Sequence, residues 1–328
     1  MTEITLIEGL RQAMDEELAR DEDVFIVGED VGPRGGVFRA TMGLFEKYGA
    51  ERVMDSPLAE LSIVGVGIGA ALYGMRPICE IQFADFIHPA FNQIVSEAAK
   101  MCYRSNGDWT VPMVIRAPYG GGIGGGLYHS QSVESFFAHV PGLKVVIPST
   151  PYDAKGLLKS AVRDPNPVMV FEPKKGYRLI KGVVPEDEEV LVPLGKAKVT
   201  REGTDLSVFA YGMMHHYCLE AAETLAGEGV QVEVVDLRSL LPLDKAAVLG
   251  SVRKTGKALV VYEDNLTCGY GAEIAAIVAD EGFTFLDAPV KRLAGPDVPA
   301  MPYSHPLQDW FMLNPDKIAA AMRDLAAY

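Results

Sequence analysis

The chain has 328 residues, of which 48% are hydrophobic and 23% charged, values typical of a soluble globular protein with two domains. Its net charge of −14 argues against nucleic acids and anionic membranes as partners. Because no apolar run is long enough to span a bilayer and the first residues do not resemble a signal peptide, we expect the protein in the cytoplasm.

The first part of the chain predicts alternating helices and strands. An amphipathic helix is expected over residues 5–20, where Thr5 and Glu8 can form a capping box. A strand over residues 24–27 leads directly to Glu29. Because ligands of open α/β sheets bind beyond the carboxyl ends of the strands, Glu29 is a candidate site residue, with an acid on a solvated loop as the alternative.

Glu60 begins an apolar, glycine-rich segment that we expect to form a buried helix as far as Tyr73. Ser56 and Pro57 are typical of a helix start, with serine as the cap and proline in the first turn. A carboxylate in the first turn of a buried helix needs a partner or a ligand. A favourable interaction with the helix dipole is the alternative. An apolar run over residues 78–83 then predicts an interior strand.

A helix over residues 88–103 and a strand over residues 112–117 precede a glycine-rich run that ends at His129. Such a run can cradle phosphate, but this one has no lysine and does not follow the G-x-x-x-x-G-K-[ST] pattern. A mobile loop that delivers His129 to a site is the interpretation we favour. A lone histidine is nevertheless more often structural.

A helix over residues 151–163 and a strand over residues 168–171 are joined by a turn at Asp164 and Asn166, residue types that commonly bond their own backbone in turns. The polar residues 174–194 are expected to form a linker.

A second α/β pattern follows the linker and predicts a mostly parallel sheet. The expected elements are strand 206–211, helix 215–226, strand 231–236, helix 244–252, strand 258–263 and helix 272–279. A proline-rich tail and a last helix over residues 315–326 complete the chain. The neighbouring His215 and His216 do not share a helix face, so we interpret them as structural. The four cysteines are far apart and predict neither a zinc site nor a disulfide framework.

Two stretches carry a resemblance to a known family: Asp55-Ser56-Pro57-Leu58-Ala59-Glu60 and Glu80-Ile81-Gln82-Phe83-Ala84-Asp85-Phe86, with a glycine-spaced helix between them. Together they resemble the β chain of the 2-oxo acid dehydrogenase complexes, in the component that decarboxylates with thiamine diphosphate. The resemblance covers essentially the whole chain. It implies two doubly wound α/β domains, a transketolase-like pyrimidine-binding domain over residues 1–185 and a transketolase C-terminal-like domain over residues 186–328.

The resemblance also implies a site shared between two kinds of chain. This chain lacks a G-D-G motif with a downstream asparagine, and in the family the α subunit holds the diphosphate and magnesium. Two α and two β chains would form the enzyme. Glu60 would hydrogen-bond the aminopyrimidine ring, the thiamine diphosphate ylide would decarboxylate the 2-oxo acid, and the acyl group would pass to a lipoyl group of the acyltransferase core.

Further residue roles follow from the same resemblance. The implied cofactor contacts, besides Glu60, are Glu29, Leu58, Ala59, Gln82 and Phe86. Phe83 and His129 would contact the substrate, and His129 would also act as a catalytic residue. Phe86 replaces a tyrosine common in the family, so the hydroxyl of that tyrosine is absent here. A structural potassium ion would be held by Met113, Ala161, Val162, Asp164 and Asn166.

The substrate is less sharply defined by the sequence. Residues 104–109, 128–131 and 291–297 resemble the branched-chain enzymes, which act on 3-methyl-2-oxobutanoate, more than those acting on pyruvate or acetoin. Pyruvate and acetoin remain alternatives because apolar pockets discriminate by only about 1–3 kcal/mol per methylene. A non-catalytic scaffold that docks the acyltransferase core is an alternative of another class. A transketolase-like transferase would need a diphosphate motif that this chain lacks.

Overall fold

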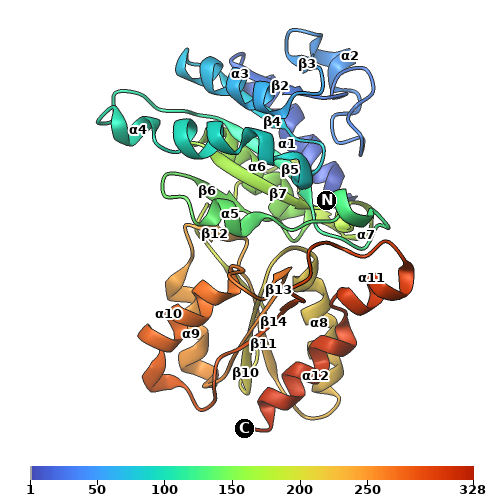
Figure 1. Ribbon diagram of the computed structural model, residues 1–328, viewed down its shortest axis with the longest axis vertical. Coiled ribbons are helices and arrows are strands. Elements are labelled where there is room, and N and C mark those ends of the chain that lie inside the picture. The colour runs from blue at the N-terminus through green and yellow to red at the C-terminus, as the bar shows by residue number, and fades with distance from the viewer. Residues whose placement is uncertain (1) are drawn as a thin grey trace. The chain divides into compact units, whose positions relative to one another are not determined.

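The computed structural model describes residues 2–328, which form two compact units (Figure 1). The first unit consists of the residues up to Tyr119 together with Phe136–Leu194. The second consists of Gly120–Ser135 and Gly195–Tyr328. The domain boundary expected after residue 185 stays a prediction. The glycine-rich run with His129 is part of the second unit.

The first unit is built on a parallel sheet with the strand order β6-β7-β5-β4-β2-β3 within the unit. Its strands are β2 (Val24–Gly28), β3 (Val53–Asp55), β4 (Arg76–Glu80), β5 (Val114–Tyr119), β6 (Lys144–Val146) and β7 (Val168–Pro173). Every residue of β2, β5 and β7 is buried, as expected of parallel strands that are covered on both faces.

Helices and short turns surround this sheet. They are α1 (Leu6–Arg20), α2 (Leu44–Tyr48), α3 (Glu60–Leu72), the short 3-10 turns Ala84–Phe86 and His88–Ala90, the π-helical segment Gln93–Ala98, α4 (Met101–Arg104), α6 (Pro151–Arg163) and α7 (Gly176–Leu179). The capping box of α1 is confirmed, because the Thr5 backbone N–H donates to Glu8 Oε2 at 2.7 Å. The bounds predicted for α6 are also confirmed.

The start of α3 differs from the prediction. The helix begins at Glu60 with Ala59 as its cap, and Ser56 does not cap it. The Ser56 backbone N–H donates to the Gly28 carbonyl at 2.8 Å, so the chain is still extended beside β2 at this residue. The first helical turn therefore forms only after Leu58.

Two other predictions from the sequence were only partly correct. The helix expected over residues 88–103 is broken into the short turns, the π-helical segment and α4. The stretch expected to be a linker contains α7 and also β8 (Lys181–Val184), which pairs antiparallel with β1 (Thr2–Thr5). The partner of β8 is about 180 residues away in the sequence, and local patterns do not report such a pairing.

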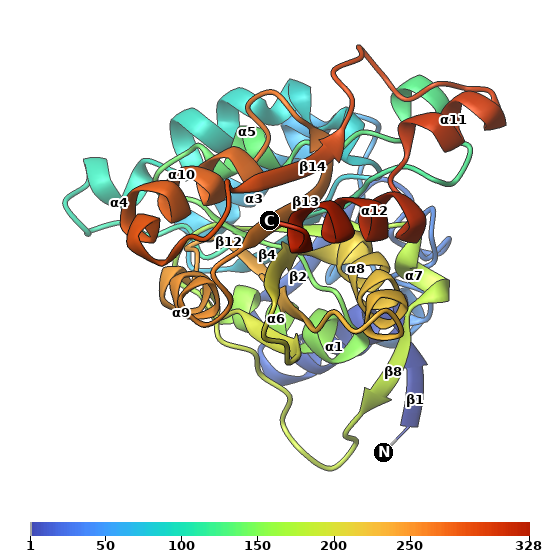
Figure 2. The same cartoon turned by 90° about the horizontal axis from the view of Figure 1, so that it is seen from below.

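The second unit has a five-stranded sheet in the order β14-β13-β10-β11-β9, in which only the edge strand β9 is antiparallel to its neighbour. Helices α8 and α12 cover one face of this sheet, and α9 and α10 the other (Figures 1 and 2). The strands are β9 (Lys198–Arg201), β10 (Leu206–Ala210), β11 (Val232–Asp236), β13 (Ala258–Asn265) and β14 (Lys291–Gly295).

The helices of this unit are α8 (Gly212–Ala226), α9 (Lys245–Thr255), α10 (Gly271–Glu281), α11 (His305–Phe311) and α12 (Pro315–Ala326). The three predicted strand-helix pairs and the last helix are confirmed, whereas β14 and α11 were not predicted. Two further short elements are β12 (Ser239–Leu241) and α5 (Glu134–Ala138), and the residues of α5 are divided between the two units.

No helix within residues 2–328 is long and apolar enough to cross a membrane. In the same part of the chain, no three His, Cys, Asp or Glu side chains are grouped so that they could hold a metal ion. His215 is buried, and all four cysteines are free.

A buried ion network ties together three neighbouring strands of the first unit. Arg116 on β5 is fully buried, and its Nε and Nη2 atoms donate to the Glu172 carboxylate on β7 at 2.8 and 2.7 Å. Its Nη1 atom donates to Glu80 on β4. The Tyr177 hydroxyl donates to Glu172 as well. Burial raises the pKa of the Glu80 carboxyl, and the positive charge of Arg116 opposes that rise.

Replacement of Arg116 by methionine should strongly destabilise the first unit. The change leaves two buried carboxylates without their cation, which costs about 3–5 kcal/mol in comparable cases. Urea unfolding of the purified protein would measure the loss. Arg323→Met, which removes an exposed pair with Glu228, is the matched control and should have little effect. A variant at Arg116 as stable as that control would contradict this account of the network.

Candidate active site

Three predicted site residues meet at the carboxyl ends of β2 and β4 in the first unit. Glu29 follows β2, Gln82 follows β4, and Glu60 opens α3. The Gln82 side-chain amide donates to the Glu29 carbonyl at 3.4 Å. Burial raises the pKa of the Glu29 carboxyl, and the negative charges of Asp30 and Glu60 raise it further. Glu29 and Glu60 are therefore close enough to repel one another.

Glu60 is half-buried in the first turn of a helix whose cap offers no side-chain hydrogen bond. The backbone N–H groups of Ser62 and Ile63 donate to the Ala59 carbonyl, at 2.8 and 3.0 Å, and start the helical pattern there. The helix dipole favours an anion at this position. Because the side chain is only half-buried, a ligand can approach the carboxylate.

Aromatic rings lie next to this group of polar residues. The Phe83 ring centroid is 5.2 Å from that of Phe38 and 5.5 Å from that of Phe86. Phe38 is in turn 5.3 Å from Tyr177, whose hydroxyl belongs to the Arg116 network. The Lys174 ammonium lies 5.7 Å from the Phe83 centroid. Half-buried rings beside carboxylates suit a flat heterocycle with a basic ring nitrogen.

One face of α3 and the residues beside it is apolar and exposed, contrary to the expectation of a buried helix. Ile63, Val64 and Ile68 are on the buried face. The exposed side includes Leu58 at 72%, Leu61 at 47%, Val66 at 55% and Tyr73 at 94%. Isolated exposed apolar residues are ordinary, but several on one helix indicate a contact surface.

His129 lies in the second unit, at the end of the short 3-10 turn Gly126–Tyr128. The structure thus brings Glu29, Glu60, Gln82, Phe83 and Phe86 together in the first unit, with Leu58 and Ala59 in the turn before Glu60, and it describes His129 within the other unit.

The segment Gly120–Ser135 that carries His129 is bonded to the rest of the second unit at both ends. The Gly121 backbone N–H donates to the Glu263 carboxylate, and the Ser135 hydroxyl donates to Asp264 Oδ2 at 2.5 Å. Glu134 is fully buried and accepts a hydrogen bond from the Tyr211 hydroxyl at 2.9 Å. The Gly121 amide already donates to the Glu263 carboxylate, and a phosphate would be repelled by that negative charge. These contacts therefore disfavour a phosphate-binding role for the glycine run.

The residues expected to hold potassium lie near the amino ends of strands in the first unit. They are Met113, Ala161, Val162, Asp164 and Asn166. The Lys144 ammonium bonds both carboxylate oxygens of Asp164, at 2.5 and 2.7 Å. The Arg76 guanidinium donates to the Val162 carbonyl at 2.8 Å. Two protein cations therefore already pair with these oxygens, and potassium binding stays a prediction.

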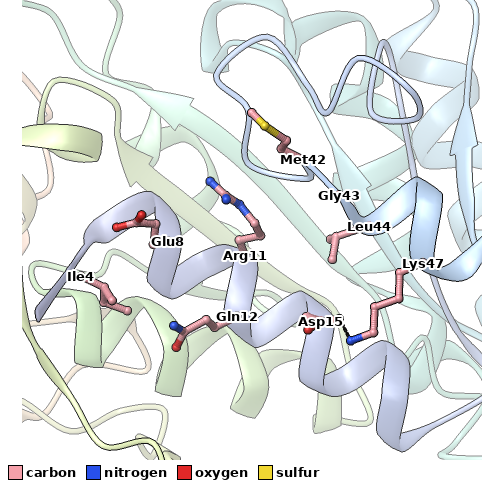
Figure 3. Close-up of a pocket in the computed structure, with 9 residues that line it drawn as sticks. All are labelled: Ile4, Glu8, Arg11, Gln12, Asp15, Met42, Gly43, Leu44 and Lys47. Carbon is pink, nitrogen blue, oxygen red and sulfur yellow. Dashed lines mark hydrogen bonds and ion pairs between the residues drawn. The ribbon is translucent and has the colours of Figure 1, made fainter. Parts of the chain in front are cut away.

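A separate pocket of about 340 Å³ lies beside α1 and the start of α2 (Figure 3). Its lining residues are Ile4, Glu8, Arg11, Gln12, Asp15, Met42, Gly43, Leu44 and Lys47. Asp15 accepts a hydrogen bond from Lys47 at 2.6 Å, and Glu8 is occupied by the capping box. None of the site residues predicted from the sequence lines this pocket.

Two family models match the chain: the transketolase pyrimidine binding domain over residues 2–180 and the transketolase C-terminal domain over residues 195–318. The chain is 60% identical over 328 residues to the 2-oxoisovalerate dehydrogenase subunit beta of Bacillus subtilis (strain 168), with 100% of both chains covered. It is 46% identical to the pyruvate dehydrogenase E1 component subunit beta of the same organism, with 99% of both covered.

Two more distant relatives extend the comparison. The acetoin:2,6-dichlorophenolindophenol oxidoreductase subunit beta of Bacillus subtilis (strain 168) is 42% identical, with 98% of this chain and 97% of the relative covered. A solved structure described as a split gene transketolase, inactive beta4 tetramer, has a TM-score of 0.78 at 24% identity and covers 99% of this chain and 98% of its own. At that identity, the likeness establishes the fold alone.

The buried Glu134 carboxyl predicts a specific pH dependence of stability. Burial raises its pKa well above the ordinary value, and the charges of Asp264 and Glu263 raise it further, whereas the Tyr211 hydroxyl lowers it. At pH values between the ordinary and the raised pKa, the folded state binds more protons than the unfolded state. The free energy of unfolding should therefore fall as the pH rises through this window.

Glu134→Gln removes this titration but keeps an oxygen that can accept from Tyr211. Urea unfolding at a series of pH values should give a flatter dependence for the variant than for the unaltered protein. An unchanged slope above the ordinary carboxyl range would contradict the assignment.

Proposed function

The chain belongs to the family of β subunits from the thiamine-dependent decarboxylase component of 2-oxo acid dehydrogenase complexes, and we propose that it serves branched-chain substrates such as 3-methyl-2-oxobutanoate. The enzyme oxidatively decarboxylates the 2-oxo acid and transfers the acyl group to a lipoyl group. This chain is more similar in sequence to the 2-oxoisovalerate subunit than to the pyruvate and acetoin subunits, which supports a branched-chain substrate. The mechanistic part of the proposal depends above all on Glu60 and the residues beside it.

The residues around Glu60 fit the aminopyrimidine ring of thiamine diphosphate. When bound, this cofactor supplies the carbon nucleophile that attacks the 2-oxo carbon. It also takes up the electron pair that is left behind when carbon dioxide departs. Glu60 would hold a proton at the ring nitrogen, from a position that is half-buried and open to a ligand. The charge of Glu60 already raises the pKa of the nearby Glu29 carboxyl, so a proton shared with a ring nitrogen would relieve repulsion between the two acids.

The neighbouring side chains would orient the ring. Phe83 and Phe86 offer apolar contact to its faces and to the substrate, and the turn at Leu58 and Ala59 lies directly before Glu60. Gln82, anchored to the Glu29 carbonyl, keeps the end of β2 and the loop after β4 together. Phe86 has no hydroxyl and therefore contributes only packing here.

His129 would orient the 2-oxo acid carboxylate before decarboxylation, and it would later supply a proton during acyl transfer to the lipoyl group. Histidine is the side chain that most often transfers protons in general acid–base catalysis. The glycine-rich segment around His129 packs closely against its neighbours. Gly126 has φ of 60°, and a Cβ at this residue would lie 2.7 Å from the Tyr303 ring.

An α subunit would complete the site by holding the diphosphate and its magnesium ion. The exposed apolar side of α3, next to Glu60, supports a partner surface at this place. We propose an assembly of two α and two β chains in the cytoplasm that docks on a lipoyl acyltransferase core. A potassium ion near Asp164 would be structural, because that group lies at the opposite ends of the strands from Glu29 and Gln82.

Glu60→Gln should slow decarboxylation by the assembled enzyme at least ~100-fold, the range typical of general acid–base groups. The amide keeps the size of the side chain but cannot hold the proton in the same way. Glu273→Gln is the matched control, since Glu273 is also a first-turn glutamate but belongs to α10 in the other unit. Near-normal turnover of the Glu60 variant would remove the central residue of this mechanism.

His129→Ala should reduce acyl transfer to a lipoyl domain more than it reduces decarboxylation followed with an artificial electron acceptor. The larger effect on transfer is expected because His129 supplies a proton only in that step, whereas in decarboxylation it only orients the substrate. Transfer at the unaltered rate would show that this role is wrong.

A further inference from the structure

We infer that Glu263 and Asp264, two consecutive acids at the end of β13, are positioning residues that hold the segment Gly120–Ser135 closed and thereby fix His129 for acyl transfer. The inference rests on the role proposed for His129. Neither acid was singled out by the sequence, and neither belongs to the group around Glu60.

The amino end of the segment is held by Glu263. Its carboxylate accepts the Gly121 backbone N–H. At the neighbouring Gly120, φ is 86° and a Cβ would lie 3.0 Å from Glu263 Oε1. Glycine at this position therefore lets the chain pass close to the carboxylate, a conformation that other residues rarely adopt.

The carboxyl end of the segment is held by Asp264. Its Oδ2 atom accepts the Ser135 hydroxyl at 2.5 Å, and its Oδ1 atom accepts the Asn265 backbone N–H at 2.8 Å. The second bond fixes the orientation of the carboxylate relative to its own strand. The two acids lie in the irregular stretch of β13 between Val261 and Asn265, and β13 is paired with β14 on both sides of this stretch.

Two further contacts hold the middle of the segment. The Gly124 backbone N–H donates to the buried Gln308 side chain on α11 at 3.2 Å. Gly126 packs closely against the Tyr303 ring. These contacts come from the tail of the chain, so the segment with His129 is bonded at both ends by β13 and between them by the region around α11.

Asp264 is placed unfavourably for a charged group, since it is largely buried and lies close to the Glu134 carboxyl, and this points to a functional reason for the carboxylate. Burial raises the pKa of the Asp264 carboxyl, and Glu134 lies close enough for the Asp264 charge to raise its pKa as well. Neutral amides could accept the same hydrogen bonds without this repulsion. Carboxylates, however, form the stronger, charge-assisted bonds that a glycine-rich segment needs to keep one conformation.

Loss of the Asp264 contact should affect transfer selectively. Asp264→Ala and Ser135→Ala, each in the assembled α/β enzyme, should lower kcat for acyl transfer to a lipoyl domain by about 10- to 100-fold, because a displacement of about 1 Å can have an effect of that size. Decarboxylation with an artificial electron acceptor should fall by a smaller factor than transfer does, because His129 only orients the substrate in that step. Asp264→Asn, which keeps an acceptor for Ser135, should recover part of the transfer rate.

A matched control separates positioning from general stability. Ser251→Ala removes another buried serine–carboxylate bond of the second unit, to Glu233 at 2.7 Å, and should leave transfer unchanged. In the His129→Ala background, Asp264→Ala should cause no further loss of transfer. Equal losses in both half-reactions, or additive losses with His129→Ala, would overturn the inference.

Hydrogen exchange distinguishes failure of this inference from failure of the role of His129. Amides of residues 120–135 should exchange faster in Asp264→Ala than in Ser251→Ala. If exchange rises but His129→Ala transfers normally, the segment is held as described and the role of His129 is wrong. Unchanged exchange in Asp264→Ala would overturn the positioning role itself.

Discussion

The candidate site depends on the buried contact of Arg116 with two carboxylates. This contact joins β4, β5 and β7 through Glu80 and Glu172, near the loops that carry Glu29 and Gln82. Buried ion networks of this kind seldom add stability, but breaking one is expensive. The network therefore works mainly as a geometric constraint. Through Tyr177 it also reaches the aromatic rings around Phe83, so that the polar and apolar walls of the site share one support.

We propose that the first unit supplies one half of a cofactor site. Its carboxylate, amide and aromatic rings suit the heterocyclic end of thiamine diphosphate. An apolar surface on α3 lies beside Glu60 and is exposed in the isolated chain. A partner that buries this surface would also exclude water from Glu60, which strengthens any hydrogen bond made there.

Local sequence patterns predicted the elements whose signals are local. The capping box of α1, the helices α6 and α12, and the strand-helix alternation of the second unit are confirmed. The position of Glu29 after β2 is also as expected. The start of α3 was wrong because the Ser56 backbone is bonded to Gly28, a contact between strands. The ring contacts of Phe38 with Phe83 and Tyr177 could not be predicted, and neither could the contacts of the acids at the end of β13. These contacts join residues that are 45 to 142 positions apart in the sequence.

The most direct test of this account is the decarboxylation of 3-methyl-2-oxobutanoate and of pyruvate with thiamine diphosphate and magnesium. The assay would use the chain alone and the chain co-purified with its α subunit. We expect activity only in the pair, with the branched acid as the faster substrate. Activity of the chain alone would contradict the divided site, and a preference for pyruvate in the pair would contradict the substrate while leaving the roles of Glu60 and its neighbours intact.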